Sequence, residues 1–208
     1  MAKPTLNELI TELVETGWLK SSRLIEAFYH IKREEFTPSD IKDLAYSNEA
    51  LPIGFGQTIS QPLVVAFMLE LLNPLPGEKI LDIGAGSGWT SALLAHCVSP
   101  TGIVIAVEII PELVEFGKSN VAKYNFLTKG IVKFIGADGK KGYLPEAPYD
   151  KILASASAQE IPKDWYNQLK IGGRMVVSRN QSVVVVDKLE ANKYQEKIYE
   201  GFVFVPLV

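Results

Sequence analysis

The sequence "LDIGAGSGWTS", residues 81–91, joins a strand to a helix through three closely spaced glycines. The apolar run "KILDIG" before it is typical of a buried strand, and "TSALLAHCV" after it has the pattern of a helix. Glycines between a strand and a helix allow a ligand to approach the backbone closely. The dinucleotide motif G-x-G-x-x-G would need a glycine where Trp89 stands, so this loop does not predict a dinucleotide site.

Acidic residues mark the ends of the neighbouring strands. Asp82 precedes the first glycine, where a carboxylate would repel a pyrophosphate but suits the sulfonium and ammonium of S-adenosylmethionine. Glu108 ends the strand "GIVIAVE" and can accept ribose hydroxyls, and Asp138 after the third strand can accept the adenine amine. The ordered set predicts an S-adenosylmethionine site formed by Asp82, Gly84, Gly86, Ser87, Gly88, Glu108, Asp138 and Gly139. The alternative is a set of tight turns with solvated acids.

Strands and helices alternate along most of the chain around this loop. The pattern predicts an α/β fold with a doubly wound, mostly parallel seven-stranded sheet, the Rossmann-like fold of S-adenosylmethionine-dependent methyltransferases. Helical spacing at residues 5–16 and 21–29, followed by an irregular stretch over 32–61, predicts an N-terminal helical cap with a covering loop over 1–60. The core then spans 61–208 and ends in paired strands, and we expect one domain over 1–208.

Composition excludes several classes of protein. The 208 residues are 47% hydrophobic and 22% charged with a net charge of −3, so nothing predicts a nucleic-acid or membrane partner, and we expect a cytoplasmic monomer. The N-terminal "MAKPTLNELI" is amphipathic and unlike a signal peptide. Cys97 fits a buried core thiol. His30 and His96 are far apart and lack ligand partners at useful spacing, so no metal site is expected.

The segment after the fourth strand bears on the methyl acceptor. Amine methyltransferases of this fold commonly carry an Asn/Asp-Pro-Pro-aromatic sequence there, whereas this chain has the small, neutral "LASASAQ". The local acids also supply no obvious metal triad for a catechol. A carboxylate acceptor is already ionised at neutral pH and needs only placement, hydrogen-bond donors and exclusion of water. The sequence therefore favours a carboxylate.

The segment "GFGQTISQP", residues 54–62, places an amide and two hydroxyls just before a predicted helix. Ser60 stands two residues before Pro62, where the helix starts, so its hydroxyl can either cap that helix or serve a site. No histidine or lysine in the segment can activate Ser60 as a nucleophile.

Nearly the whole chain resembles the protein-L-isoaspartate O-methyltransferase family. The resemblance rests on "LIEAFYHIKREEFTP", "LPIGFGQTISQP", "LDIGAGSGWTSALLAH", "VEIIPELVEFGKSNV" and "FVFVPLV". It implies that Gln57, Thr58 and Ile59 cover the cofactor and that Ser60 is the catalytic hydroxyl. It also implies methyl esterification of the isoaspartyl α-carboxylate in aged proteins and peptides, with S-adenosylhomocysteine as product. The ester then cyclises to a succinimide, which begins repair.

Three departures from the family concern the acceptor. The chain has Asn48 where the family often has aspartate, and Ser155 within a stretch that is often alanine-rich. Residues 178–180 read Ser-Arg-Asn where the family usually has Pro-Val-Gly, a region that helps to hold the substrate peptide. We therefore expect Ser60, Ser155 and Arg179 to contact the acceptor, although Arg179 can equally be a solvated arginine. The alternative function is a family member that binds S-adenosylmethionine but methylates another carboxylate, or binds without turnover.

Overall fold

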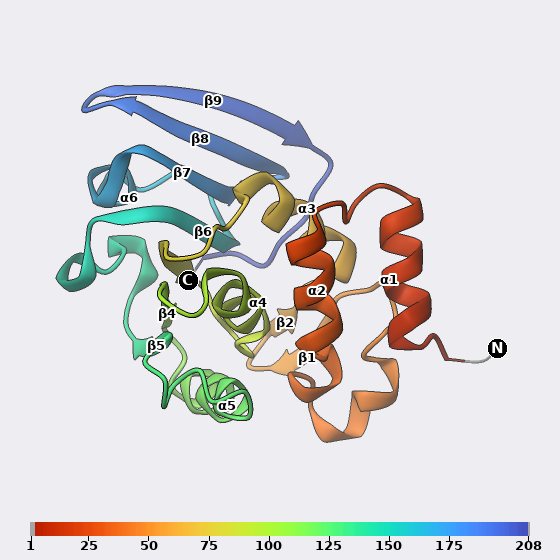
Figure 1. The fold of residues 1–208 in the computed structure, drawn as a ribbon. Helices are drawn as coiled ribbons and strands as arrows, with labels where there is room; N and C mark the ends of the chain where they lie inside the picture. Colours follow the sequence, from red (N-terminus) through yellow and green to blue (C-terminus); the bar gives the residue numbers. More distant parts are fainter. Residues whose placement is uncertain (1–2, 208) are drawn as a thin grey trace.

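The computed structural model describes residues 3–207. Its main sheet contains β3 (Lys79–Ile83), β4 (Ile103–Glu108), β5 (Val132–Gly136), β6 (Tyr149–Ala158), β7 (Leu169–Arg179), β8 (Ser182–Glu190) and β9 (Lys193–Glu200). The strand order is β5-β4-β3-β6-β7-β8-β9, parallel through β7 and antiparallel beyond it (Figure 1). This confirms the predicted seven-stranded, mostly parallel sheet. β9 is a mostly exposed edge strand that carries Lys193, Glu196, Lys197 and Glu200.

Both faces of the central parallel strands β3, β4 and β6 are mostly buried, as expected where parallel strands carry continuous apolar runs. One face packs against α3 (Pro62–Leu72), α4 (Trp89–Val98) and α5 (Pro111–Ala122), and the other against α6 (Lys163–Gln168). Successive residues of β3 alternate between the two apolar clusters: Ile80 joins the first, and Leu81 and Ile83 join the second. Within the described chain, no helix has the length and apolarity needed to cross a membrane.

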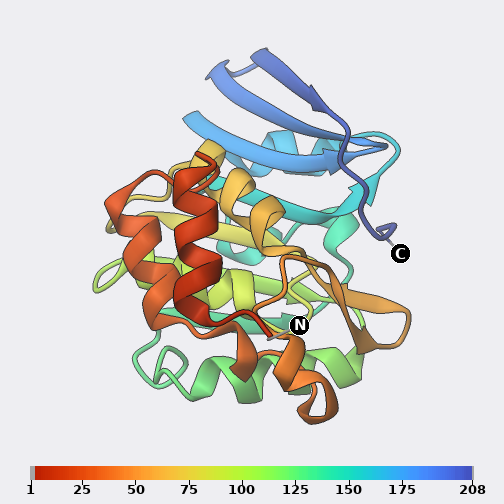
Figure 2. The ribbon, with the colours of Figure 1, turned by 90° about the vertical axis from the view of Figure 1, so that its right-hand side faces the viewer.

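The N-terminal region contains α1 (Leu6–Glu15), α2 (Ser22–His30) and two short 3-10 helices, η1 (Arg33–Glu35) and η2 (Ser39–Leu44). Both α-helices lie beside the sheet domain (Figures 1 and 2). Leu13 of α1 and Phe28 of α2 belong to the same apolar cluster as Leu153 of β6. The apolar core is therefore continuous from these helices to the sheet.

The stretch over residues 32–61 is more ordered than the sequence indicated. Besides η1 and η2 it contains a hairpin of β1 (Leu51–Gly54) and β2 (Gln57–Ile59). Its turn has positive φ at Gly54, Phe55 and Gly56, namely 92°, 55° and 71°. Glycine adopts these angles freely, so the two glycines make the turn possible around the exposed Phe55. The segment carrying the hydroxyls is thus the second strand of a hairpin.

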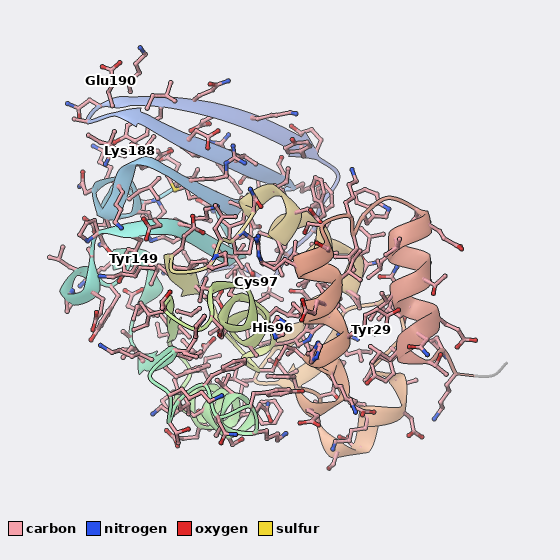
Figure 3. All side chains as sticks on the ribbon, viewed as in Figure 1. Tyr29, His96, Cys97, Tyr149, Lys188 and Glu190 are labelled. Carbon is pink, nitrogen blue, oxygen red and sulfur yellow. The ribbon has the colours of Figure 1, made fainter. Side chains whose placement is uncertain are left out.

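Helix packing brings together the two histidines, which are far apart in the sequence. α2 lies against α4, and the rings of His30 and His96 stack with centroids 5.1 Å apart. Their separation in the sequence suggested that they share no site, but tertiary packing brings them together. Figure 3 shows His96 on α4 near α2.

Candidate active site

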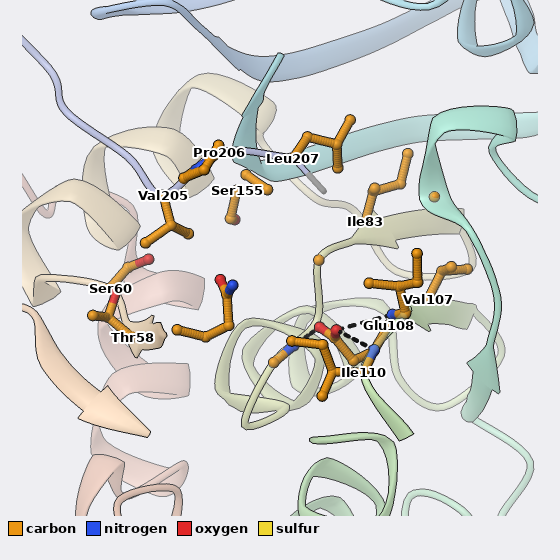
Figure 4. Close-up of a pocket in the computed structure, with 16 residues that line it drawn as sticks. Thr58, Ser60, Ile83, Val107, Glu108, Ile110, Ser155, Val205, Pro206 and Leu207 are labelled. Atoms are coloured by element: carbon orange, nitrogen blue, oxygen red, sulfur yellow. Dashed lines mark hydrogen bonds between the residues drawn. The ribbon is translucent and has the colours of Figure 1, made fainter. Parts of the chain in front are cut away.

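A cavity that is partly open to solvent lies at the carboxyl ends of the parallel strands. In open α/β sheets this is the usual place for a ligand. One side of the cavity, the strand-end wall, is formed by Ile83, Gly84, Gly86, Val107, Glu108, Ile109, Ile110 and Gly139. The rest of the lining, which we call the covering wall, is formed by Gln57, Thr58, Ser60, Ser155, Ala156, Val205, Pro206 and Leu207. Figure 4 shows Thr58 and Ser60 across the cavity from Glu108.

Glu108 is the best-fixed polar group on the strand-end wall. Its Oε2 accepts the Gly86 N–H at 2.9 Å, and its Oε1 accepts the N–H groups of Ile109 and Ile110, both at 2.9 Å (Figure 4). Only 7% of the residue is exposed. The three backbone donors fix the orientation of the carboxylate, while Oε2 keeps a free acceptor position. The arrangement suits a hydroxyl donor in the cavity.

The glycines of residues 84–88 have different tasks. Gly84 and Gly86 have φ values of +75° and +51°, and a Cβ on either would meet a neighbouring side chain at 3.3 Å. Both glycines line the cavity, so they keep its floor open. Gly88 precedes α4, where a Cβ would lie 2.9 Å from Val121 Cγ2. It serves helix packing, and Ser87 faces a smaller adjoining cavity together with Ile59.

Asp82 lies behind the strand-end wall and does not line the cavity. It is fully buried, and its Oδ2 accepts the hydroxyls of Ser91 at 2.6 Å and Thr90 at 3.2 Å. Its Oδ1 is buried without a partner among residues 3–207. Burial is the largest of the effects that raise the pKa of Asp82 to about 6. An incompletely paired buried carboxylate favours a positively charged ligand nearby, which fits a sulfonium or ammonium.

Asp138 is likewise engaged by its own loop. Its side chain accepts the Lys140 N–H at 2.9 Å and caps the short helix η3 (Gly139–Lys141). Gly139 lines the cavity, whereas Asp138 does not. A Cβ at Gly139 would lie 2.5 Å from Ile83 Cγ2, so only a glycine can pack against β3 at this position without a shift of the backbone or of Ile83.

Thr58, Ser60 and Ser155 line three neighbouring cavities, one of which is the small cavity that Ser87 faces. Besides the first cavity, they line a second, mainly apolar one of about 720 Å³. Its other lining residues are Ala50, Gln61, Val64, Val203, Phe204 and Val205. These three hydroxyl-bearing residues therefore lie at the junction between these spaces.

The capping alternative for Ser60 is wrong. The residue before α3 is Gln61, and it makes no side-chain cap. Asn48 takes that role, because its Oδ1 accepts the Leu63 N–H at 3.0 Å. The Gln61 amide in turn donates to the Asn48 carbonyl at 2.8 Å. Asn48 thus caps the start of α3, and Ser60, which lines the cavities, is not needed as the helix cap.

Arg33 is a residue that the sequence analysis missed. It is 1% exposed, and its guanidinium donates to the carbonyls of Ala45 at 2.6 Å, Glu49 at 2.8 Å and Ser60 at 3.1 Å. Among the described residues it has no carboxylate partner, and burial lowers its pKa to about 9. Arg33 therefore fixes the backbone of the segment that carries Ser60. Its sequence context gave no signal, because carbonyl partners leave no trace in residue types.

The end of the chain was missed as part of the site. After β9, the backbone crosses to the end of β6, where the Ser157 N–H donates to the Val205 carbonyl at 2.8 Å. The Leu207 N–H donates back to the Ser157 carbonyl at 2.9 Å. These two bonds hold residues 205–207 against the cavity. The sequence indicated only paired strands in this region.

Arg179 does not line either cavity. Its Nη1 lies 3.3 Å from Glu196 Oε2 on β9, and Glu196 Oε1 accepts the Tyr166 hydroxyl at 3.1 Å. Arg179 ends β7, which pairs there with β8, so its side chain reaches the outer strands. The structure therefore does not bring Arg179 to Ser60 and Ser155, with which the sequence grouped it.

Fold and site together define a class of protein. A parallel sheet with a glycine loop after β3 and an acid ending β4 is the architecture of S-adenosylmethionine-dependent methyltransferases. A family model described as "Protein-L-isoaspartate(D-aspartate) O-methyltransferase (PCMT)" matches residues 4–208. The chain belongs to this family.

Individual relatives agree with this assignment. The chain is 45% identical over 204 residues to a protein-L-isoaspartate O-methyltransferase of Methanopyrus kandleri, covering 96% of this chain and 89% of the relative. The chain is 42% identical to the protein-L-isoaspartate O-methyltransferase of Aeropyrum pernix, and the match covers 96% of this chain and 78% of that relative.

Solved structures show the same fold. A protein-L-isoaspartate O-methyltransferase structure that is 28% identical has a TM-score of 0.87, covering 97% of this chain and 65% of that one. A Plasmodium falciparum structure in complex with S-adenosyl-L-homocysteine is 21% identical, with a TM-score of 0.89 and 99% of both chains covered. At this identity the second likeness concerns the fold alone.

Proposed function

We propose that this protein methylates the α-carboxylate of L-isoaspartyl residues in aged proteins and peptides, with S-adenosylmethionine as donor and S-adenosylhomocysteine as product. The observation that carries the proposal, beside family membership, is the meeting of two cavities at Ser60, Thr58 and Ser155. One cavity suits the polar donor, and the other is apolar and suits a peptide. When bound, the cofactor supplies an electrophilic methyl group.

The strand-end wall is our candidate donor site. Glu108 Oε2 is placed to accept a ribose hydroxyl, and Gly84, Gly86 and Gly139 let the donor approach the backbone. The unpartnered oxygen of Asp82 favours the donor's positive charge from behind the wall. Gln57 and Thr58 would cover the donor from the opposite side. Ile59, Ser87, Gly88 and Asp138 support the surrounding loops in this proposal.

On the acceptor side, Ser60 orients the carboxylate and does not act as a covalent nucleophile. An ionised carboxylate needs no proton removed, so a single donor hydroxyl suffices. Ser155 offers a second hydroxyl at the same junction. The apolar side chains of Val64 and Phe204 line the space that residues flanking the isoaspartate would occupy, and they exclude water.

A methanol-release assay tests the proposal, with an isoaspartyl peptide beside its aspartyl twin. We expect methyl transfer to the first peptide and essentially none to the second. Donor binding without release from either peptide would overturn the proposal and favour the alternative, a binding protein or a changed acceptor. That alternative rested on residues 178–180, and Arg179 lies outside both cavities.

We further propose that the protein acts as a cytoplasmic monomer without a nucleic-acid or membrane partner. The net charge of −3 supports the absence of a polyanionic partner, because the chain as a whole does not attract polyanions. Sedimentation across a range of concentrations would test the monomer.

A further inference from the structure

Glu26, His30 and His96 form a cluster that the donor and acceptor sites do not use. Glu26 and His30 lie one turn apart on α2. His96 lies on α4 (Figure 3). One possible ligand atom from each of the three lies within 4.8 Å of the others. These are the only two histidines of the chain. We propose that this histidine cluster binds a divalent transition-metal ion, with Zn²⁺ as the best match.

The hydrogen bonding of the histidine cluster prepares it for a metal ion. His30 Nδ1 lies 2.9 Å from the Glu26 carbonyl oxygen, which fixes Nδ1 as the donor and leaves the Nε2 lone pair free. Such an outer hydrogen bond is usual for metal-binding histidines. Burial first, and then the nearby His30, lowers the pKa of His96.

The Glu26 carboxylate completes the set. Its Oε1 lies 3.9 Å from His96 Nε2, too far for a hydrogen bond but close enough for both atoms to share an ion after a small rotation. The Glu26 side chain is 63% exposed and that of His96 is 23% exposed, so an ion can enter from solvent. Two imidazoles and one carboxylate suit Zn²⁺, whereas Ca²⁺ and Mg²⁺ prefer oxygen ligands.

The two helices are held together independently of any ion. Phe28 of α2 and Trp89 of α4 pack edge to face with ring centroids 5.5 Å apart. Trp89 Nε1 also donates to the Ile31 carbonyl at 3.2 Å. The helices that carry the ligands are therefore a preformed scaffold, on which the stacked imidazole rings must turn for both to face one ion. An ion bound there would link the N-terminal helices to the core and stabilise the fold.

Zinc titration of tag-free protein, freed of metal with a chelator, tests the proposal by calorimetry and thermal unfolding. We expect one saturable site, and a rise in Tm of about 5–10 °C when Zn²⁺ is at about a hundred times its Kd. Mg²⁺ should give no comparable shift. Glu26→Gln should weaken Zn²⁺ binding about tenfold, and His30→Gln with His96→Gln should abolish it.

The controls separate this site from other zinc ligands. Glu115→Gln removes an exposed carboxylate on α5, and Cys97→Ala removes the buried thiol beside His96; both should bind Zn²⁺ like the unmutated protein. Glu26 is exposed enough to be changed without disturbing helix packing, so its variant remains informative if the histidine variants unfold. Absence of saturable binding up to millimolar Zn²⁺ overturns the proposal. So does full binding by the double histidine variant, or loss of binding in Cys97→Ala.

Discussion

The two walls of the cavity differ in how far apart their residues lie in the sequence. The strand-end wall comes from the last residues of β3 and β4 and from the segments directly after β3, β4 and β5. The covering wall joins residues 57, 58 and 60, the end of β6 and residues 205–207, which are three segments far apart in the sequence. The strand-end wall is thus specified locally, whereas the covering wall exists only once the chain has folded. If the first holds the donor and the second places the acceptor, variants of the two walls must fail in different ways.

Ser60→Ala is the most severe test of the covering wall. We expect kcat to fall about ten- to a thousandfold, as for loss of one transition-state hydrogen-bond donor, with donor affinity and Tm nearly unchanged. Methanol release and calorimetry measure the two effects. Ser119→Ala on α5 is a matched control and should behave like the unmutated protein. If Ser60→Ala instead binds the donor more weakly and keeps its kcat, the proposed division between a donor wall and an acceptor wall is wrong.

Glu108→Gln tests the strand-end wall. The amide presents an N–H₂ group to backbone donors that now face a carboxylate, and it loses the charge that a hydroxyl prefers. Donor affinity should fall about ten- to a hundredfold, while kcat at saturating donor stays within about twofold. Glu115→Gln, an exposed glutamate on α5, provides the control for calorimetry. Unchanged affinity would exclude Glu108 from the donor site.

Arg33→Lys asks whether the covering wall depends on its buried support. Lysine keeps the charge but cannot spread its donors over the carbonyls of Ala45, Glu49 and Ser60. We expect the free energy of unfolding to fall by about 3 kcal/mol and kcat by about tenfold, because Ser60 is less well placed. Donor affinity should change little. Arg23→Lys is the control, and an unchanged kcat in folded Arg33→Lys would contradict this role.

The raised pKa of Asp82 predicts a pH dependence that belongs to the strand-end wall. Because the folded pKa of about 6 exceeds the unfolded value, cofactor-free protein loses stability as pH rises through 6. The loss is about 2–3 kcal/mol between pH 4 and pH 8. Other carboxylates titrate in the same range, so the measurement is the difference in unfolding free energy between the unmutated protein and Asp82→Asn. A difference independent of pH would show that Asp82 is not perturbed.

Arg179→Ala should have the smallest effect, since Arg179 belongs to neither wall. Its partly exposed pair with Glu196 is worth less than about 1 kcal/mol, so we expect the peptide KM and kcat to change less than about twofold. Kinetics with isoaspartyl peptide measure this. A tenfold rise in KM would contradict this expectation and support a contact between Arg179 and the acceptor, as the sequence suggested.

Residue types predicted the strand-end wall well because strand, glycine loop and terminal acid follow one another in the chain. Gly84, Gly86, Glu108 and Gly139 all line the cavity. Asp82 was expected there too, but the hydroxyls of residues 90 and 91, in the first turn of α4, hold its carboxylate inside. A motif gives the position of a residue along a loop, but not the direction in which its side chain points.

The missed features all depend on contacts between distant segments. Arg33 resembles a surface charge in "IKREEF", and only the fold surrounds it with carbonyls. Residues 205–207 have no local pattern that indicates a cavity. His30 and His96 meet because α2 packs on α4. Helices and most strands follow from periodicity, but which of their faces meet is decided by packing.

The exposed edge strand β9 has a consequence for work among damaged proteins. A protein that acts on aged chains meets unfolded segments whose unpaired strands can add to any open sheet edge. β9 presents Lys193, Glu196, Lys197 and Glu200 along that edge. An incoming strand would have to strip water from charges of both signs, which opposes co-aggregation. We therefore expect this edge to disfavour co-aggregation with the proposed substrates.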